Sequence, residues 1–385
     1  VLQSVAGSAA PEEVLRSFHP KHEQFHKLRA LYLKLRGPGD AAKYKIDSRG
    51  PMLVPGDTGP EIEALRNRLG VPAAQGKADV YDAPLVAAVK AFQRANRLSA
   101  DGYVGPRTRA AFQKGPGDKI KQILASMEQW RWMPRDLGER HALVNIPAYK
   151  IDFVEGGKSV MSERVIVGRP RTPTPVFSKP MSSIVLKPSW ILPDSIKREK
   201  LLRGRSLEGQ GLVVKKGQRI VKSWKVDWSK ANLSHYAIYQ PSGDGNALGN
   251  VKFLFPNKFS VYLHDTPNKS LFTSAERTFS HGCVRLRDPL KVAQFIFDWD
   301  RGPGMVDVKR LVTRSGPDNN EIALQKPLPV HMGYFTVWVG TDGEAQYLDD
   351  PYGHVERVAL ALDGQWDKID RGPRHDTDPL IAASS

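Results

Sequence analysis

Residues 278–286 read Thr-Phe-Ser-His-Gly-Cys-Val-Arg-Leu, and they contain the only cysteine of the 385-residue chain, Cys283. A second histidine, His264, lies upstream in the segment Val-Tyr-Leu-His-Asp-Thr-Pro at 261–267. A thiol becomes a strong nucleophile when a base or a positive charge favours the thiolate. Most free cysteines are simply small buried hydrophobic side chains. A lone cysteine with histidines elsewhere in the chain is nevertheless a candidate catalytic nucleophile, and its neighbours here favour that interpretation.

His264 ends a predicted strand, and the loop at 268–277 must return to the same place before Cys283 is reached. This arrangement would put a base beside the thiol. Gly282 permits a tight turn, and the backbone amides of Gly282 and Cys283 could point at a developing oxyanion. Either histidine alone could be an ordinary strand-end or turn residue, but the combination predicts a cysteine acyl-transfer site.

The chain is strongly basic, with a formal net charge of +16 and a pI near 9.7. Such a charge favours polyanionic surroundings. Because the basic residues are scattered and no recognised nucleic-acid module is present, we expect no nucleic-acid partner. No apolar run is long enough to span a membrane, and no signal peptide is visible at the start of the sequence. With one cysteine and no Cys/His set at ligand spacing, we expect no metal and no cofactor.

The first part of the chain has the periodicity of helices. We predict a helix over 12–36 that Pro20 breaks into two, and another over 117–131. Between them, residues 56–115 predict a small three-helix unit. Its helices begin near Pro60 (capped by Asp57 or Thr58), at Asp82 and at Pro106.

From residue 139 the pattern changes to the two-residue period of strands. We predict strands over 141–146, 149–153, 162–167, 184–186, 237–239, 261–263, 334–339 and 345–348, and one helix over 290–299 capped by Asp288. Short strands with Gly and Pro turns are typical of an all-β sandwich or barrel. Residues 193–233 interrupt this rhythm and form either a lid or an inert insertion. Residues 351–385 are expected to be a loose tail.

Two motif sets carry a family resemblance. "HDTP … FSHGCVRL", preceded by "GNVKFLFPN", resembles the catalytic signature of the YkuD-domain L,D-transpeptidases. "EQWRWMP", "VIVGRPRTPTPVF" and "KPSWILP" resemble the larger periplasmic branch of that family. "GDTGPEIEALRNRLG … YDAPLVAAVKAFQRANRLSADGYVGPRTRAAF" resembles a three-helix peptidoglycan-binding domain.

The resemblance implies an α+β multidomain protein. We expect a helical scaffold at 1–55 and 116–137, a peptidoglycan-binding-like module at 56–115, and a catalytic domain at 138–350 built as an all-β YkuD-like sandwich or barrel. Residues 193–233 would be a capping subdomain inserted in that domain, and 351–385 the C-terminal tail.

The resemblance also implies roles for individual residues. Cys283 would be the nucleophile and His264 the general base, oriented by a backbone carbonyl at Asp265. Gly282 would donate its N–H to the oxyanion.

The remaining motif positions are expected to bind substrate. Ser280 and His281 match the motif, and His281 would line the site, with an exchange of roles between His281 and His264 as the alternative. Arg285 would either hold a stem-peptide carboxylate or brace the loop. Tyr262, two residues before the base, would line the pocket, and Asp265 is also expected among the substrate-binding residues.

The implied function is an L,D-transpeptidase of the cell wall. A tetrapeptide donor stem would acylate Cys283 with loss of D-Ala, and the diaminopimelate amine of an acceptor stem would complete a 3→3 crosslink. Carbapenems would acylate the same thiol, and the location would be the periplasm or cell envelope. Alternatives are an L,D-carboxypeptidase, a lipoprotein-to-wall ligase, or a non-catalytic peptidoglycan-binding protein.

Overall fold

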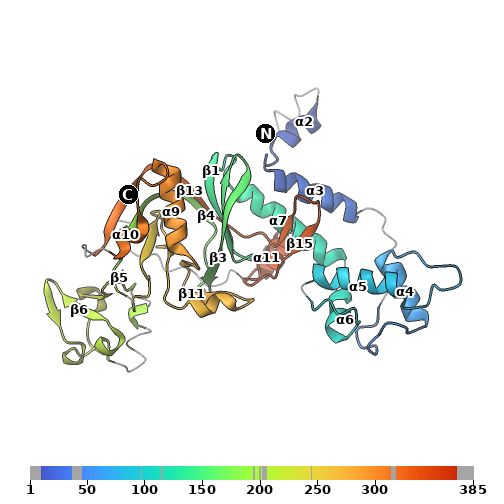
Figure 1. Cartoon of the computed structure of the whole chain (residues 1–385), viewed down its shortest axis with the longest axis horizontal. Helices are drawn as coiled ribbons and strands as arrows, with labels where there is room; N and C mark the ends of the chain where they lie inside the picture. Colours follow the sequence, from blue (N-terminus) through green and yellow to red (C-terminus); the bar gives the residue numbers. More distant parts are fainter. Residues whose placement is uncertain are drawn as a thin grey trace. The chain divides into compact units, whose positions relative to one another are not determined.

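The structure is a computed structural model that describes residues 10–36, 46–96, 98–113, 116–193, 196–198, 201, 206–243, 245–313 and 318–370 (Figure 1). The chain divides into two compact units. One contains the residues up to Arg135 together with Phe335–Ile369, and the other contains Asp136–Tyr334. We call them the helical unit and the β unit.

The helical unit is built on two helices that pack together, α3 (Glu23–Arg36) and α7 (Pro116–Trp132). The predicted break at Pro20 is confirmed, because the short helix α2 (Pro11–Ser17) ends before it and α3 begins after it. Phe25 and Leu28 are fully buried. Trp130 stacks on Phe335, with their ring centroids 4.3 Å apart.

Three further helices form a small core of their own: α4 (Pro60–Leu69), α5 (Ala83–Ala95) and α6 (Pro106–Gln113). Asp82 caps α5 as predicted, since its side chain accepts a hydrogen bond from Leu85 N at 3.1 Å. The predicted cap of α4 is wrong. Gly59 occupies the cap position without a side-chain bond, and Asp57 instead accepts from Val54 N at 2.8 Å.

The helical unit also contains β14 (Val337–Val339), β15 (Ala345–Tyr347) and α11 (His354–Leu362). We expected 335–350 in the catalytic domain and a loose tail from 351, and both expectations are wrong. The Gln24 side chain bonds both N and O of Val339, Ser126 Oγ accepts from Val337 N, and α11 packs on α7. Residues 371–385 of the expected tail lie outside the described residues.

The β unit contains a nine-stranded sheet in the order β11-β3-β12-β10-β9-β4-β13-β1-β2, and β2 also pairs with β3. Eight strands therefore form a closed ring of pairings from which β11 branches, which confirms a barrel-like domain. The strands are β1 (Arg140–Asn145), β2 (Lys150–Glu155), β3 (Lys158–Gly168), β4 (Phe177–Leu186), β9 (Val251–Leu254), β10 (Leu263–His264), β11 (Thr278–Ser280), β12 (Val284–Leu286) and β13 (Asn320–Gly333).

Two helices accompany this sheet, α9 (Pro289–Arg301) and α10 (Val308–Thr313). Asp288 caps α9 as predicted, accepting from Lys291 N at 3.3 Å. The helix packs against β9 and β13. Single turns of 3-10 helix complete the described structure: η2 (Glu208–Gln210), η3 (Ser223–Lys225), η4 (Leu233–His235), η5 (Lys269–Thr273) and η6 (Trp366–Lys368).

A second, smaller sheet has the order β5-β8-β6-β7 and its own core around Leu192, Leu212, Val214 and Ile238. Its strands are β5 (Trp190–Ile191), β6 (Val213–Lys216), β7 (Arg219–Val221) and β8 (Tyr236–Gln240). The predicted insertion at 193–233 is thus too short. The strand at 237–239 belongs to this small sheet and not to the barrel. The charged helix predicted over 196–202 lies partly outside the described residues.

In the described part of the chain, none of the helices has both the length and the apolar character needed to cross a membrane.

Candidate active site

Two short parallel strands set the geometry of the site. β10 pairs with β12 through Leu263↔Val284 and His264↔Arg285. Leu263 and Val284 are fully buried on one face of this pair. Side chains alternate along a strand, so His264 and Arg285 lie on the opposite face. The residues two positions earlier, Tyr262 and Cys283, continue that face. The expected nucleophile and base are therefore brought to diagonal positions on neighbouring strands.

The Cys283 thiol is half-buried, and both the backbone N–H and the hydroxyl of Tyr262 act on it. Burial raises the pKa of the thiol. The Tyr262 backbone N–H, the Lys252 ammonium, the Tyr262 hydroxyl and the Arg285 guanidinium all act in the opposite direction. In the resting site the thiol donates to Ser260 O at 3.7 Å. The two donors of Tyr262 and the two cations are thus placed to stabilise a thiolate once it forms.

His264 is buried, with 5% of its surface exposed. Its Nδ1 lies 2.5 Å from the backbone oxygen of Asp265, so Nδ1 carries the proton and donates to that carbonyl. This leaves the lone pair on Nε2, as a general base requires. Burial lowers the pKa of His264 to about 3, with Arg285, Lys252 and Lys269 contributing in the same direction. The imidazole is therefore neutral at neutral pH.

The Asp265 side chain braces the strand end and does not orient the imidazole. Oδ1 accepts from Thr266 N and Lys269 Nζ, both at 2.6 Å, and Oδ2 accepts from Asn250 N at 2.9 Å. Gly249 has φ +57°, and a Cβ there would lie 2.3 Å from Asp265 Oδ2. The close approach of this glycine is what admits the buried carboxylate.

The loop from Ser280 to Cys283 is held by a hydroxyl at each side. Ser280 Oγ donates to Cys283 O at 2.5 Å and accepts from Gly282 N at 3.2 Å. On the other side, Thr174 Oγ1 donates to Gly282 O at 2.8 Å and accepts from Gly168 N at 2.9 Å. Gly282 has φ +109°, a conformation that requires glycine.

In the resting site the Gly282 N–H donates to the Ser280 hydroxyl, and its expected role as an oxyanion donor stays a prediction. The amide of Cys283 itself is the other candidate of the two that the sequence suggested. Ser280 is consequently a loop-positioning residue and not one that lines the pocket.

His281 and Arg285 have different surroundings. His281 is exposed, its Nδ1 is 3.4 Å from Arg169 Nη2, and it lines a cavity of about 500 Å³ with Arg169, Arg171 and Thr278. Arg285 is half-buried, and its buried Nε has no hydrogen-bond partner within the described structure. Burial lowers the pKa of Arg285, and the Cys283 thiolate opposes this shift. Arg285 is thus one of the two cations that act on the thiol, with Lys252, and His281 lines the neighbouring cavity.

Two residues of the site were missed from the sequence. Lys252 pairs with His264 across β9 and β10, and its ammonium lies 4.4 Å from the centre of the Tyr262 ring. The indole N–H of Trp190 donates to the Tyr262 hydroxyl. The period-two pattern at 251–255 was a usable signal for Lys252. No sequence signal indicated Trp190, because this residue belongs to the small sheet.

Comparison with known proteins gives two family matches. Residues 139–309 match the family described as "L,D-transpeptidase catalytic domain", and residues 58–112 match the "Putative peptidoglycan binding domain". A curated protein of Haemophilus influenzae, "Putative L,D-transpeptidase", is 30% identical over 233 residues, which are 59% of this chain and 46% of that protein. The chain thus spans about half the length of this relative.

Comparison with solved structures also finds L,D-transpeptidases. That of Xylanimonas cellulosilytica is 17% identical and covers 74% of this chain and 98% of its own, with a TM-score of 0.23. L,D-transpeptidase 1 of Mycobacterium tuberculosis is 13% identical and covers 50% and 60%, with a TM-score of 0.22.

Proposed function

Since the chain contains an L,D-transpeptidase catalytic domain at 139–309 and a peptidoglycan-binding domain at 58–112, we propose that it forms 3→3 crosslinks in peptidoglycan by cysteine acyl transfer. The observation that supports this most strongly is the surroundings of Cys283. A half-buried thiol faces two hydrogen-bond donors from Tyr262 and the cations Lys252 and Arg285, on the same strand face as a neutral, oriented imidazole.

The first half-reaction is acylation. The Cys283 sulfur attacks the carbonyl carbon of the third residue of a tetrapeptide stem, and His264 Nε2 takes the thiol proton. The tetrahedral oxyanion is stabilised by the Cys283 amide. Collapse breaks the C–N bond to the terminal D-Ala, whose amine leaves with the proton returned by His264. A thioester remains on Cys283.

The second half-reaction is transfer to an amine. The side-chain amine of diaminopimelate on a neighbouring stem attacks the thioester, and its proton passes to His264. The C–S bond breaks, the thiol is reprotonated and an amide crosslink is released. Water in place of the amine would give the carboxypeptidase reaction on the same residues.

The neutral pairing of thiol and imidazole distinguishes this scheme from one with a resting thiolate–imidazolium pair. Burial raises the pKa of Cys283 and lowers that of His264 to about 3. Proton transfer therefore accompanies attack instead of preceding it. Carbapenems, whose strained carbonyl the same thiol can attack, are the expected covalent inhibitors.

The peptidoglycan-binding domain supports a location where the polymer is present, and we place the protein in the periplasm or cell envelope. The net charge of +16 suits an anionic envelope. In this proposal the domain at 58–112 holds the polymer while Cys283 acts on its stems.

Incubation of the full chain with tetrapeptide muropeptides, followed by mass spectrometry, tests the proposal. We expect crosslinked dimers that have lost D-Ala, and no product from Cys283→Ala. Tripeptide monomers alone would indicate a carboxypeptidase. Binding to peptidoglycan without turnover would indicate a non-catalytic protein.

A further inference from the structure

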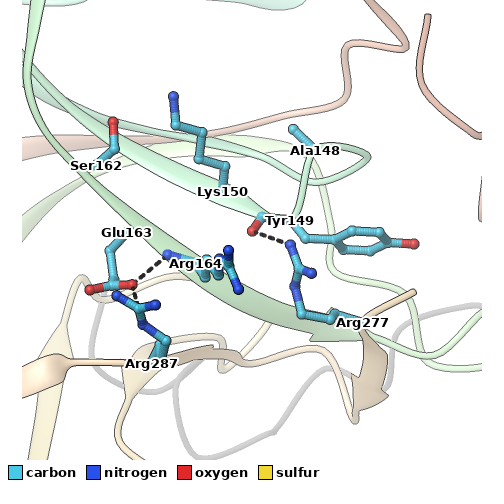
Figure 2. A pocket seen from close by; sticks show the side chains of 8 residues that line it. All are labelled: Ala148, Tyr149, Lys150, Ser162, Glu163, Arg164, Arg277 and Arg287. Carbon is cyan, nitrogen blue, oxygen red and sulfur yellow. Dashed lines mark hydrogen bonds and ion pairs between the residues drawn. The ribbon is translucent and has the colours of Figure 1, made fainter. Parts of the chain in front are cut away.

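A second cavity, of about 460 Å³, lies beside the barrel and does not include Cys283, His264 or Arg285. Its size is that of an ordinary small-ligand site. Figure 2 shows the residues that line it. They come from the β1–β2 turn, β2, β3 and the two ends of the catalytic loop: Ala148, Tyr149, Lys150, Ser162, Glu163, Arg164, Arg277 and Arg287.

The lining of this basic pocket has four cationic side chains and one carboxylate. That carboxylate already interacts with neighbouring residues of the pocket. Glu163 is buried, pairs with Arg287 Nε at 3.2 Å, and accepts from Arg164 N at 2.7 Å. Lys150 is likewise neutralised by Asp152, at 2.8 Å. The pocket therefore keeps an excess of positive charge.

Arg164 is the cation available to a ligand. Its side chain is exposed, and it has no ion-pair or hydrogen-bond partner among the described residues. It lies between the Glu163–Arg287 pair and the Arg277–Tyr149 pair (Figure 2). Arg277 is held in place by donating to the backbone oxygens of Val165, Ser274 and Tyr149. Arg277 is thus held in place on one side of the Arg164 guanidinium, and the Glu163–Arg287 ion pair lies on the other.

The position of the basic pocket relates it to the nucleophile. Arg277 immediately precedes β11, Arg287 immediately follows β12, and Arg287 N donates to Arg164 O at 3.1 Å. Cys283 and Arg287 are four positions apart in the sequence, so their Cα atoms are at most about 14 Å apart. A peptide advances about 3.5 Å per residue. A ligand bound at Cys283 therefore needs only a short extension to reach the basic pocket, because the long arginine side chains span part of the distance.

We propose that the basic pocket binds a carboxylate of the stem peptide, carried by the residue next to the one whose carbonyl Cys283 attacks. The inference rests on the proposed function. Arg164 makes the main contact, because a free guanidinium binds a carboxylate through two parallel hydrogen bonds. The ion pair between the buried Glu163 and the exposed Arg287 forms one wall of the pocket.

The test compares a stem tetrapeptide bearing the free carboxylate at that residue with the same tetrapeptide carrying a carboxamide there. Affinities are measured by calorimetry in the Cys283→Ala background of the full chain, so no turnover is needed. We expect Arg164→Gln to weaken binding of the carboxylate peptide about tenfold and to leave the carboxamide peptide unchanged. Arg164→Lys should fall between. Arg310→Gln, an exposed arginine on α10, is the matched control and should change neither affinity.

Equal affinities of Arg164→Gln and the parent for the carboxylate peptide would overturn the inference. The inference would also be overturned if inorganic phosphate competed for the pocket as well as the peptide does, since the pocket would then be a general anion site. The two proposals fail separately. If the chain forms crosslinks but Arg164→Gln has no effect on binding, only the pocket proposal is wrong. If binding depends on Arg164 but no crosslinked product forms, only the transpeptidase proposal is wrong.

Discussion

At the scale of single residues, the thiol and the imidazole of this site are joined through Tyr262. Its hydroxyl and its backbone N–H both reach Cys283, and its ring meets the His264 ring edge-on with 5.6 Å between centroids. Trp190 and Lys252 hold the same tyrosine from two other strands. Tyr262 therefore has more influence on thiol reactivity than a residue that only lines the pocket.

Replacing Tyr262 with Phe should slow alkylation of Cys283 by iodoacetamide about tenfold at pH 7. The reason is that loss of the O–H donor raises the pKa of the thiol and so reduces the fraction present as thiolate. The alkylation rate measured against pH gives the pKa directly. Tyr239→Phe, on the small sheet, is the control and should alter nothing. An unchanged pH profile for Tyr262→Phe would rule out the tyrosine as a thiolate donor.

The sequence was sufficient to find Cys283, His264 and the orienting carbonyl of Asp265, because these residues are close together in short, specific motifs. It could not reveal that the Gly282 amide is taken by Ser280 Oγ, since that depends on one hydroxyl rotamer. Nor could it place Lys252 beside His264. That contact needs the register between β9 and β10, which no local pattern encodes.

At the scale of elements, the catalytic loop is fastened to the segment that follows β3. Thr174 is 1% exposed, and its hydroxyl joins Gly168 N to Gly282 O. A Cβ at Gly168 would lie 2.1 Å from Thr172 O, so this segment fits only against glycine. The conformation of the Ser280–Cys283 turn is therefore set partly by residues more than a hundred positions earlier.

Substitution of Thr174 with Val should destabilise the β unit by about 2 kcal/mol, because a buried amide and a buried carbonyl both lose their partner. We also expect kcat to fall about tenfold as Cys283 loses its alignment. Chemical unfolding and steady-state kinetics measure the two effects. Thr174→Ser retains the hydroxyl and should stay close to the parent in both. If Val and Ser behaved alike, the hydrogen bonds would not be what holds the loop.

The elements that sequence patterns missed have identifiable causes. β13 is the longest strand, yet it contains Pro327 and Pro329 and shifts its register on β4 between Ala323 and Leu328. Proline within a run argues against a strand. The pattern at 337–347 correctly predicted two strands, but it could not tell which core would accept them. Contacts to Gln24 and Ser126, over two hundred residues away, decide that.

At the scale of the whole molecule, buried histidines make stability depend on pH in both units. Burial lowers the pKa of His264 to about 3 and that of His354 to about 4, and it also lowers the pKa of His141. In the unfolded chain these groups bind protons below about pH 6.5. Between pH 6.5 and the folded pKa the unfolded state thus holds more protons. Their contribution to stability is complete above pH 6.5 and is lost as the pH falls.

We therefore expect the free energy of unfolding of the β unit to drop by up to about 3 kcal/mol between pH 7 and pH 4.5 from His264 alone. Thermal unfolding followed across this range measures the effect, and most carboxylates titrate below it. His354→Asn should flatten the pH dependence of the helical unit while leaving that of the β unit in place. A melting temperature that is constant or rises toward pH 4.5 would contradict the burial of neutral imidazoles.

The central claim is that Cys283 carries the acyl group, and trapping the acyl-enzyme tests it most directly. The full chain is mixed with a tetrapeptide donor that lacks the acceptor amine, quenched in acid and analysed by intact mass and peptide mapping. We predict a mass increase equal to the tripeptide acyl group, located on the peptide containing Cys283 and absent from Cys283→Ala. Release of D-Ala with no adduct on Cys283 in the quenched protein, or an adduct on another residue, would contradict the account.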